Sequence, residues 1–174
     1  MSDRHAIRSA VLPCTATLAV ALWLGSLVHM LVSVATLFRA FPKAGSSVAV
    51  EAAPVLFHVT ERANLFFAIV AIVAGCSWFY VARGKALLWA VGVLVLAAAL
   101  AIVQAFYISA KMEGLRLAGA GDGETFKGLH GLSSAQYLLQ TALVLTAVLL
   151  FALSRRARAV QESLRTSPMG QFPE

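Results

Sequence analysis

The sequence predicts an all-α integral membrane protein, an antiparallel bundle of four transmembrane helices. Its composition is 60% hydrophobic and only 13% charged, which is too apolar for the surface of a soluble domain. The charges are also segregated. Four windows contain no Asp, Glu, Lys or Arg, and they lie between Arg8 and Arg39, Arg62 and Arg83, Lys85 and Lys111, and Lys127 and Arg155. Each window has about 20 residues or more, enough to cross a hydrocarbon core about 30 Å thick.

These windows define the expected elements. Residues 1–154 are predicted to form the transmembrane domain, with helices at about 11–38, 55–82, 86–109 and 131–153. Pro42 and Gly45 favour a loop after the first helix. The three-residue segment Arg83–Lys85 is expected to be a tight turn that makes the second and third helices antiparallel neighbours. Residues 155–174 are expected to form a basic cytoplasmic tail.

The basic residues predict the orientation. Arg83–Lys85 and the cluster at 155–158 directly adjoin span ends, where an excess of Lys and Arg marks the cytoplasmic side. Both termini are therefore expected to be cytoplasmic. Basic residues at the span ends contact lipid headgroups and set the topology, and this explains the net charge of +6. Nucleic acid is therefore not an expected partner.

Familiar catalytic motifs do not occur in the sequence. Cys14 and Cys76 have neither CxxC nor zinc-site spacing, and both fall inside predicted spans as small apolar residues. The sequence contains no CxxCH motif, nucleotide-binding motif or catalytic-triad spacing. A non-enzymatic role is therefore favoured, and no catalytic residue is assigned.

Polar side chains within the spans gather in the half of the bundle predicted to be outermost. Such groups are costly in a membrane, so each requires an explanation. Ser26, His29 and Ser33 share one face of the first helix because they are three and four residues apart. The remaining candidates are His58, Glu61 and Asn64 on the second helix, Gln104 and Tyr107 on the third, and His130, Ser133, Tyr137 and Gln140 on the fourth.

This polar cluster admits four interpretations. The first is structural, with members that satisfy one another's hydrogen bonds and fix the helix register. The second is a haem b site, with axial imidazoles drawn from His29, His58 and His130. The third is a site for a divalent metal such as zinc on His58, Glu61 and His130. The fourth is a proton or small-solute pathway through Glu61, His29 and Gln104.

Small and aromatic residues make two further predictions about packing. Ala68, Ala71 and Gly75 form a stripe on the second helix, and small residues allow another helix to approach closely. Trp23 lies deep in its span and is expected to pack between helices. An aromatic belt is expected around the turn at 83–85, formed by Trp78, Tyr80 and Trp89.

Three stretches of the sequence carry a resemblance to a known family. They are Leu-Phe-Arg-Ala-Phe-Pro at 37–42, Ala-Pro-Val-Leu-Phe-His at 53–58 and Phe-Lys-Gly-Leu-His-Gly-Leu-Ser-Ser at 126–134. In these segments the chain resembles the transmembrane protein 205-like family of small four-helix membrane proteins. The resemblance includes His58 and His130, and it implies a fold and a membrane location but no reaction.

The resulting functional expectation is a small multi-pass membrane protein without enzymatic activity. It would act as an accessory or structural subunit, with the lipid bilayer and other membrane protein subunits as partners. In a bacterial cell the location would be the inner membrane. The alternative is a haem b- or metal-binding membrane protein with a redox or oxidase-type role.

Overall fold

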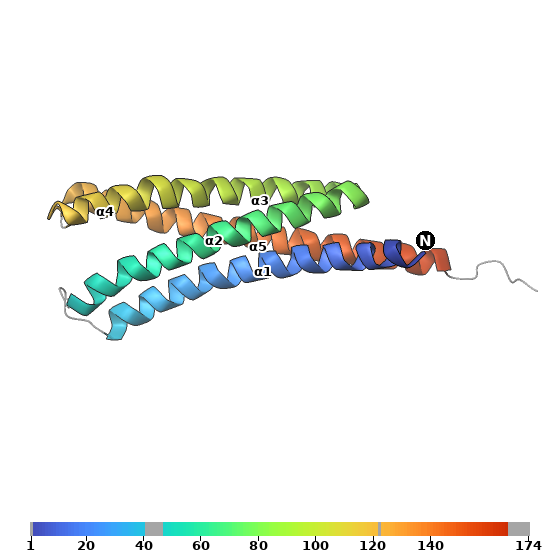
Figure 1. Cartoon of the computed structure of the whole chain (residues 1–174), viewed down its shortest axis with the longest axis horizontal. Coiled ribbons are helices and arrows are strands. Elements are labelled where there is room, and N and C mark those ends of the chain that lie inside the picture. The colour runs from blue at the N-terminus through green and yellow to red at the C-terminus, as the bar shows by residue number, and fades with distance from the viewer. Residues whose placement is uncertain (1, 41–46, 122, 167–174) are drawn as a thin grey trace, which may run out of the picture.

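The computed structural model describes residues 2–40, 47–121 and 123–166, which form an all-α bundle (Figure 1). Its elements are α1 (Ser2–Ala40), α2 (Ser47–Ala82), α3 (Lys85–Val103), the π-helical turn η1 (Gln104–Ile108), α4 (Ser109–Leu117) and α5 (Glu124–Thr166). α3, η1 and α4 follow one another without a break and make one long rod. Within the described part of the chain, four segments are long and apolar enough to span a membrane; they are 11–37, 52–82, 85–117 and 124–160. The chain is a multi-pass membrane protein.

The helices are longer than predicted. α2 begins at Ser47 and contains Pro54, which the prediction had placed in a loop. Most of the interval between the predicted third and fourth helices is helical, in α4 and the start of α5, and α5 continues to Thr166 through part of the predicted tail. Charge-free windows mark the apolar core and not the helix ends, since a helix can continue into the aqueous phase with charged side chains. Residues 41–46 and 167–174 lie outside the described residues.

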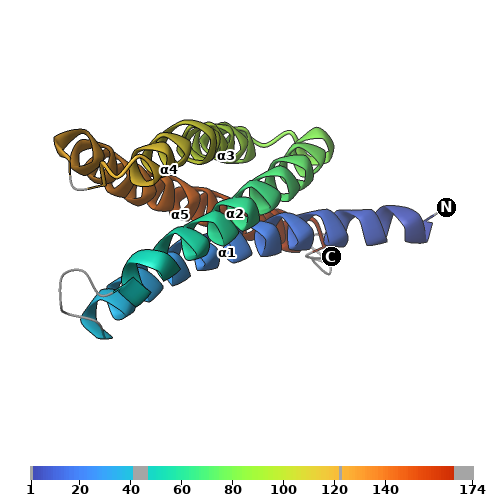
Figure 2. The ribbon, with the colours of Figure 1, turned by 60° about the vertical axis from the view of Figure 1, so that its left-hand side comes forward.

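The rods form a closed ring of neighbours. α1 packs on α2, α2 on α3, α3 on α5, and α5 on α1. Consecutive rods run antiparallel (Figure 1), as predicted. α2 and α5 are therefore diagonal across the bundle. At the end where α1 stops and α2 starts, this helix pair diverges from α4 and α5 (Figures 1 and 2). We call this the open end.

The turn between α2 and α3 is as tight as predicted. Only Arg83 and Gly84 separate the two helices. Arg83 has φ 46°, in the left-handed region, and its N–H donates to the Phe79 carbonyl at 2.7 Å. The backbone thus reverses within two residues, which holds α2 and α3 side by side.

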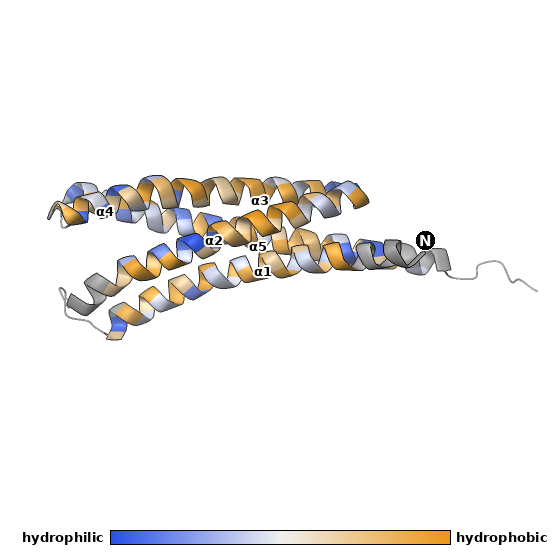
Figure 3. Ribbon diagram, viewed as in Figure 1, coloured by the Kyte–Doolittle hydropathy of each residue, from blue (hydrophilic) through white to orange (hydrophobic). Residues whose placement is uncertain are grey.

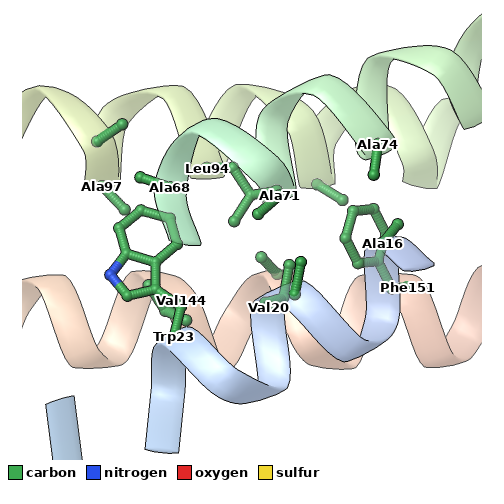
Figure 4. Packing of buried hydrophobic residues seen from close by; sticks show 14 of the residues in the cluster. Ala16, Val20, Trp23, Ala68, Ala71, Ala74, Leu94, Ala97, Val144 and Phe151 are labelled. Carbon is green, nitrogen blue, oxygen red and sulfur yellow. The ribbon is translucent and has the colours of Figure 1, made fainter. Parts of the chain in front are cut away.

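A dry core of apolar residues holds the middle of the bundle together. Trp23 of α1, Ala68 of α2, Ala97 of α3 and Val144 of α5 are buried there and lie close together (Figure 4). The prediction that Trp23 packs between helices is confirmed. The opposite faces carry large exposed apolar side chains, and apolar residues dominate the central part of the helices (Figure 3). This surface suits contact with lipid chains.

The small-residue stripe on α2 makes close contact with other helices. A Cβ atom added at Gly75 would lie 3.3 Å from Phe151 Cζ and 3.4 Å from Val91 Cγ2. The prediction of a close helix contact is confirmed. The aromatic belt is only partly as predicted, since Trp78 is buried with its ring centroid 5.3 Å from that of Phe151. Its position on α2 faces the bundle, whereas Tyr80 and Trp89 are exposed, as expected for a belt.

Candidate functional site

A hydrogen-bonded polar network crosses the bundle towards the open end. The Ser109 hydroxyl of α4 donates to Glu61 Oε1 of α2. The amide of Gln104 in η1 donates to Ser109 Oγ at 3.0 Å and to Ser133 Oγ of α5 at 2.9 Å. The chain of bonds therefore joins α2 to α5, the two diagonal helices, through the third rod.

The π-helical turn makes this network possible. Gln104 and Ser109 are five residues apart, and in a regular α-helix they would point about 140° apart around the axis. The π-helical turn widens the helix between Gln104 and Ile108, so the two side chains share a face and bond to each other. Such turns occur frequently at functional sites.

Glu61 is buried deeply for a carboxyl group, since only 5% of its surface is exposed. A buried carboxyl is costly unless hydrogen bonds or an opposite charge compensate. Ser109 provides a hydrogen bond, and Nδ1 of His58 lies 3.7 Å from Glu61 Oε2. The carboxyl is therefore held in place by side chains of α2 and α4.

Several buried polar atoms around this network have no hydrogen-bond partner among the described residues. They are Asn64 Oδ1, Gln104 Oε1, the Tyr137 hydroxyl and, further into the bundle, Gln140 Nε2. All four residues are almost completely buried. Unpartnered buried polar atoms are rare and call for an explanation. The site therefore contains buried donor and acceptor atoms that make no hydrogen bond to the described residues, inside an otherwise apolar bundle.

A cavity of about 420 Å³ lies against this network at the open end. Its walls come from every rod and from the α4–α5 connection. The apolar part of the wall includes Val34, Pro54, Phe57, Met112 and Phe126. The volume falls within the range of about 300–1,000 Å³ that is usual for small-molecule sites.

The polar part of the cavity wall adjoins the buried carboxyl. Ser109, His58 and Ser133 line the cavity. Ser109 bonds directly to Glu61, His58 Nδ1 lies 3.7 Å from Glu61 Oε2, and Ser133 bonds to Gln104. The inner end of the cavity is thus separated from the Glu61 carboxyl by a single layer of side chains.

The structure brings two of the three candidate histidines to one cavity. His58 of α2 and His130 of α5 both line it. His29 lies on the exposed face of α1, its Nε2 3.3 Å from Ser33 Oγ, and is not a lining residue. Within residues 2–40, 47–121 and 123–166, no three His, Cys, Asp or Glu side chains are grouped closely enough to hold a metal ion. The haem and metal interpretations stay predictions.

The other predicted polar residues have different surroundings. Tyr107 is exposed, with Lys111 Nζ 5.7 Å from its ring centroid. Ser26 and Ser33 are half-buried on α1, and Gln140 is buried in the core. The predicted cluster is therefore divided, because its α1 members and Tyr107 lie apart from the network around Glu61.

Sequence reasoning missed Ser109 and the pair Glu113–Arg116. Ser109 was taken as the last residue of a helix, and its five-residue distance from Gln104 fits no α-helical face. Arg116 makes a two-pronged contact with Glu113, with distances of 2.8 and 2.7 Å. The i,i+3 spacing of this pair is a helix signature, and it was overlooked because the segment was read as a loop.

Comparisons with models of protein families, with curated proteins and with solved structures found no match for this chain. The resemblance at 37–42, 53–58 and 126–134 therefore stays an expectation. The site must be interpreted from its own geometry. The chain is a multi-pass membrane protein of four antiparallel apolar helices, with a polar network and an adjoining cavity at one end.

Proposed function

We propose that this protein is a non-enzymatic membrane subunit that binds a small amphipathic molecule in the cavity at its open end. The observation that carries the proposal is the make-up of the cavity wall. Apolar side chains such as Phe57 and Phe126 line the cavity together with the hydroxyl of Ser109 and the imidazole of His58, which both lie next to Glu61. A molecule with an apolar body and one polar group complements this arrangement.

The bonding of the serines favours binding over covalent chemistry. Ser109 donates to a carboxyl, and Ser133 accepts from the Gln104 amide. A nucleophilic serine requires a base that takes its proton, usually an imidazole. Among the described hydrogen bonds, neither hydroxyl is joined to an imidazole and both oxygens accept from the Gln104 amide, which suits a rigid hydrogen-bonding wall.

We further propose that the protein works as an accessory subunit of a larger membrane complex. The support comes from the exposed face of α1. His29 is exposed there between Val28 and Val32, which are also exposed, and nothing lies within 4 Å of a Cβ added at Gly25. An imidazole facing lipid chains is unfavourable, and a neighbouring helix packed at Gly25 would cover it.

Binding in the cavity can be tested by filling it. Ala53 lines the cavity and is half-buried, whereas Ala142 is exposed on α5. We expect Ala53→Trp to weaken binding of an alkyl amphiphile to the protein in lipid nanodiscs by tenfold or more. Ala142→Trp is the matched control and should bind as the wild type does. Equal affinity for both variants would contradict the proposal.

The accessory role has a separate test. After solubilisation in a mild detergent, we expect a defined set of membrane proteins to co-purify with the wild type. His29→Leu should lose these partners, while Val32→Leu on the same exposed face should keep them. A wild-type protein that purifies without any stoichiometric partner would argue against an accessory role.

A further inference from the structure

We infer that the end of the bundle opposite the cavity selectively binds an anionic phospholipid, with its phosphate between the α2–α3 turn and α5. Five cations build this site, and we call them the basic end: Arg83 and Lys85 at the turn, and Arg155, Arg156 and Arg158 on α5. A selective site goes beyond the general contact of span ends with headgroups. It is also independent of the cavity, which lies at the open end.

Helix packing places the cations of the turn and of α5 at one level. A Cβ atom added at Gly75 would lie 3.3 Å from Phe151 Cζ of α5 and 3.4 Å from Val91 Cγ2 of α3, so Phe151 and Val91 are level. At about 1.5 Å per residue, residues 155–158 lie roughly 6–10 Å beyond Phe151, and Lys85 lies about 9 Å beyond Val91. Both distances run towards the same end, because α3 and α5 are antiparallel (Figure 1). Packed helices lie about 8–10 Å apart, so these long side chains can reach one phosphate.

The charges of the basic end are not compensated within the described residues. The described ion pairs of lysine and arginine are Glu113–Arg116 and Glu124–Lys127, which both lie at the open end. None of the five cations of the basic end takes part in a described ion pair. The open end therefore neutralises cations with its own carboxylates, whereas the basic end attracts an anion from outside the chain.

Two of the arginines lie on the face of α5 that is turned towards the other helices. Arg155 and Arg158 follow the buried Phe151 by four and seven residues and therefore share its face. α5 continues to Thr166, past the α2–α3 turn (Figure 1). Gly84 in that turn is exposed, and nothing lies within 4 Å of a Cβ added to it. A phosphate thus has room above the turn, and an arginine can bind it through two parallel N–H bonds.

The first turn of α3 adds donors at the same place. Gly84 is the N-cap of α3, and no side chain caps this helix. The first N–H groups of a helix have no acceptor within it, and the N-terminus carries a partial positive charge. These groups supplement the cations and favour the same kind of ligand.

The surface next to the cations suits a lipid better than a soluble anion. Leu88 and Trp89 of α3 and Leu153 of α5 are exposed and lie within about one turn of the basic residues. A tryptophan beside cations at a span end is typical of the membrane interface. A phosphate bound at the basic end would therefore continue into acyl chains that lie on this apolar surface.

The test compares two lipids with the same chains and different head groups. Native mass spectrometry of the detergent-solubilised protein measures the binding of dioleoyl phosphatidylglycerol and of dioleoyl phosphatidylcholine. We expect the phosphatidylglycerol to bind at least tenfold more tightly, and soluble glycerol 3-phosphate at millimolar concentration not to displace it. Equal affinity for the two lipids would overturn the inference. Displacement by glycerol 3-phosphate would assign the site to a soluble anion and overturn the lipid.

A pair of double variants separates the site from net charge. Arg155→Gln with Arg158→Gln should abolish the preference for phosphatidylglycerol. Arg39→Gln with Lys111→Gln removes two exposed cations at the open end and should keep it. A preference that survives the first pair, or that is lost with both pairs, would overturn the site. If the first pair does not fold, Lys85→Gln in the exposed turn replaces it with the same expected loss. Failure of the inference would leave the proposed cavity binding intact.

Discussion

Gln104 Nε2 lies 2.9 Å from Ser133 Oγ, a contact between residues 29 positions apart in the chain. It closes a chain of hydrogen bonds that begins at Glu61 and passes through Ser109. The helices at its two ends, α2 and α5, are diagonal in the bundle. The π-helical turn therefore links the two diagonal helices through the third rod, and the network should contribute to stability as well as to binding.

Removing the Ser133 hydroxyl should destabilise the bundle. Ser133→Ala leaves the buried Gln104 amide with one hydrogen bond fewer, and hydrogen bonds between membrane helices contribute about 0.6–2 kcal/mol. Ser134→Ala is the control, because Ser134 is exposed and, among the described residues, its hydroxyl bonds to the His130 carbonyl of its own helix. Thermal unfolding in detergent should show a lower midpoint for Ser133→Ala alone. Matching midpoints would mean that the network carries no stability.

A larger side chain at Gly75 should force helices apart. Gly75→Leu would place atoms against Phe151 and Val91, and overpacking of this kind costs about 1–3 kcal/mol. Gly92 is exposed with open space around it, so Gly92→Leu should leave the melting temperature unchanged. A melting curve of Gly75→Leu that superimposes on the wild type would show that the helix contact can adjust without loss.

The two cavity histidines can be tested for a shared ligand by a double-mutant cycle. His58 and His130 are both exposed to a large extent, so without added ligand we expect small and additive effects of His58→Ala and His130→Ala, within about 0.5 kcal/mol each. If zinc or haem binds to both imidazoles, coupling should appear in the unfolding free energy when that ligand is added. Additive effects under every condition would eliminate a shared haem or metal site.

Orientation in the membrane is open to a direct labelling test. We expect the Arg83–Gly84 turn to be cytoplasmic, because basic residues flank it. In a background without Cys14 and Cys76, a membrane-impermeant thiol reagent added to intact cells should label Ala120→Cys and not Gly84→Cys. The reverse pattern would place the cavity and Glu61 on the cytoplasmic side.

The spans could be predicted from the sequence because the membrane imposes a simple rule. The part of a helix that crosses the hydrocarbon must carry no unpaired charge over the full thickness of that layer. The four charge-free windows therefore identify the four rods. The rule does not apply beyond the hydrocarbon. The helical segments 47–54 and 110–117 therefore carry charged or helix-breaking residues, and the sequence predicts loops there.

The site was predicted in part, for reasons that differ between residues. Glu61 and Asn64 share a face through three-residue spacing, and both side chains are buried. Ser109 was missed because the π-helical turn breaks the α-helical period on which the reasoning depends. His29 was grouped with the cluster because it shares a face with Ser26 and Ser33. Periodicity shows which residues share a face, but it does not show whether that face points into the bundle or to the lipid.

The two-residue turn at Arg83–Gly84 also constrains how the protein can be inserted during biosynthesis. Two residues reach at most about 7 Å, so the end of α2 and the start of α3 must always lie on the same side of the bilayer. Because this turn is too short for one span to stay in water while the other crosses, we expect the two helices to enter the membrane as one hairpin. A change in the charge of the turn should then invert both spans together or neither.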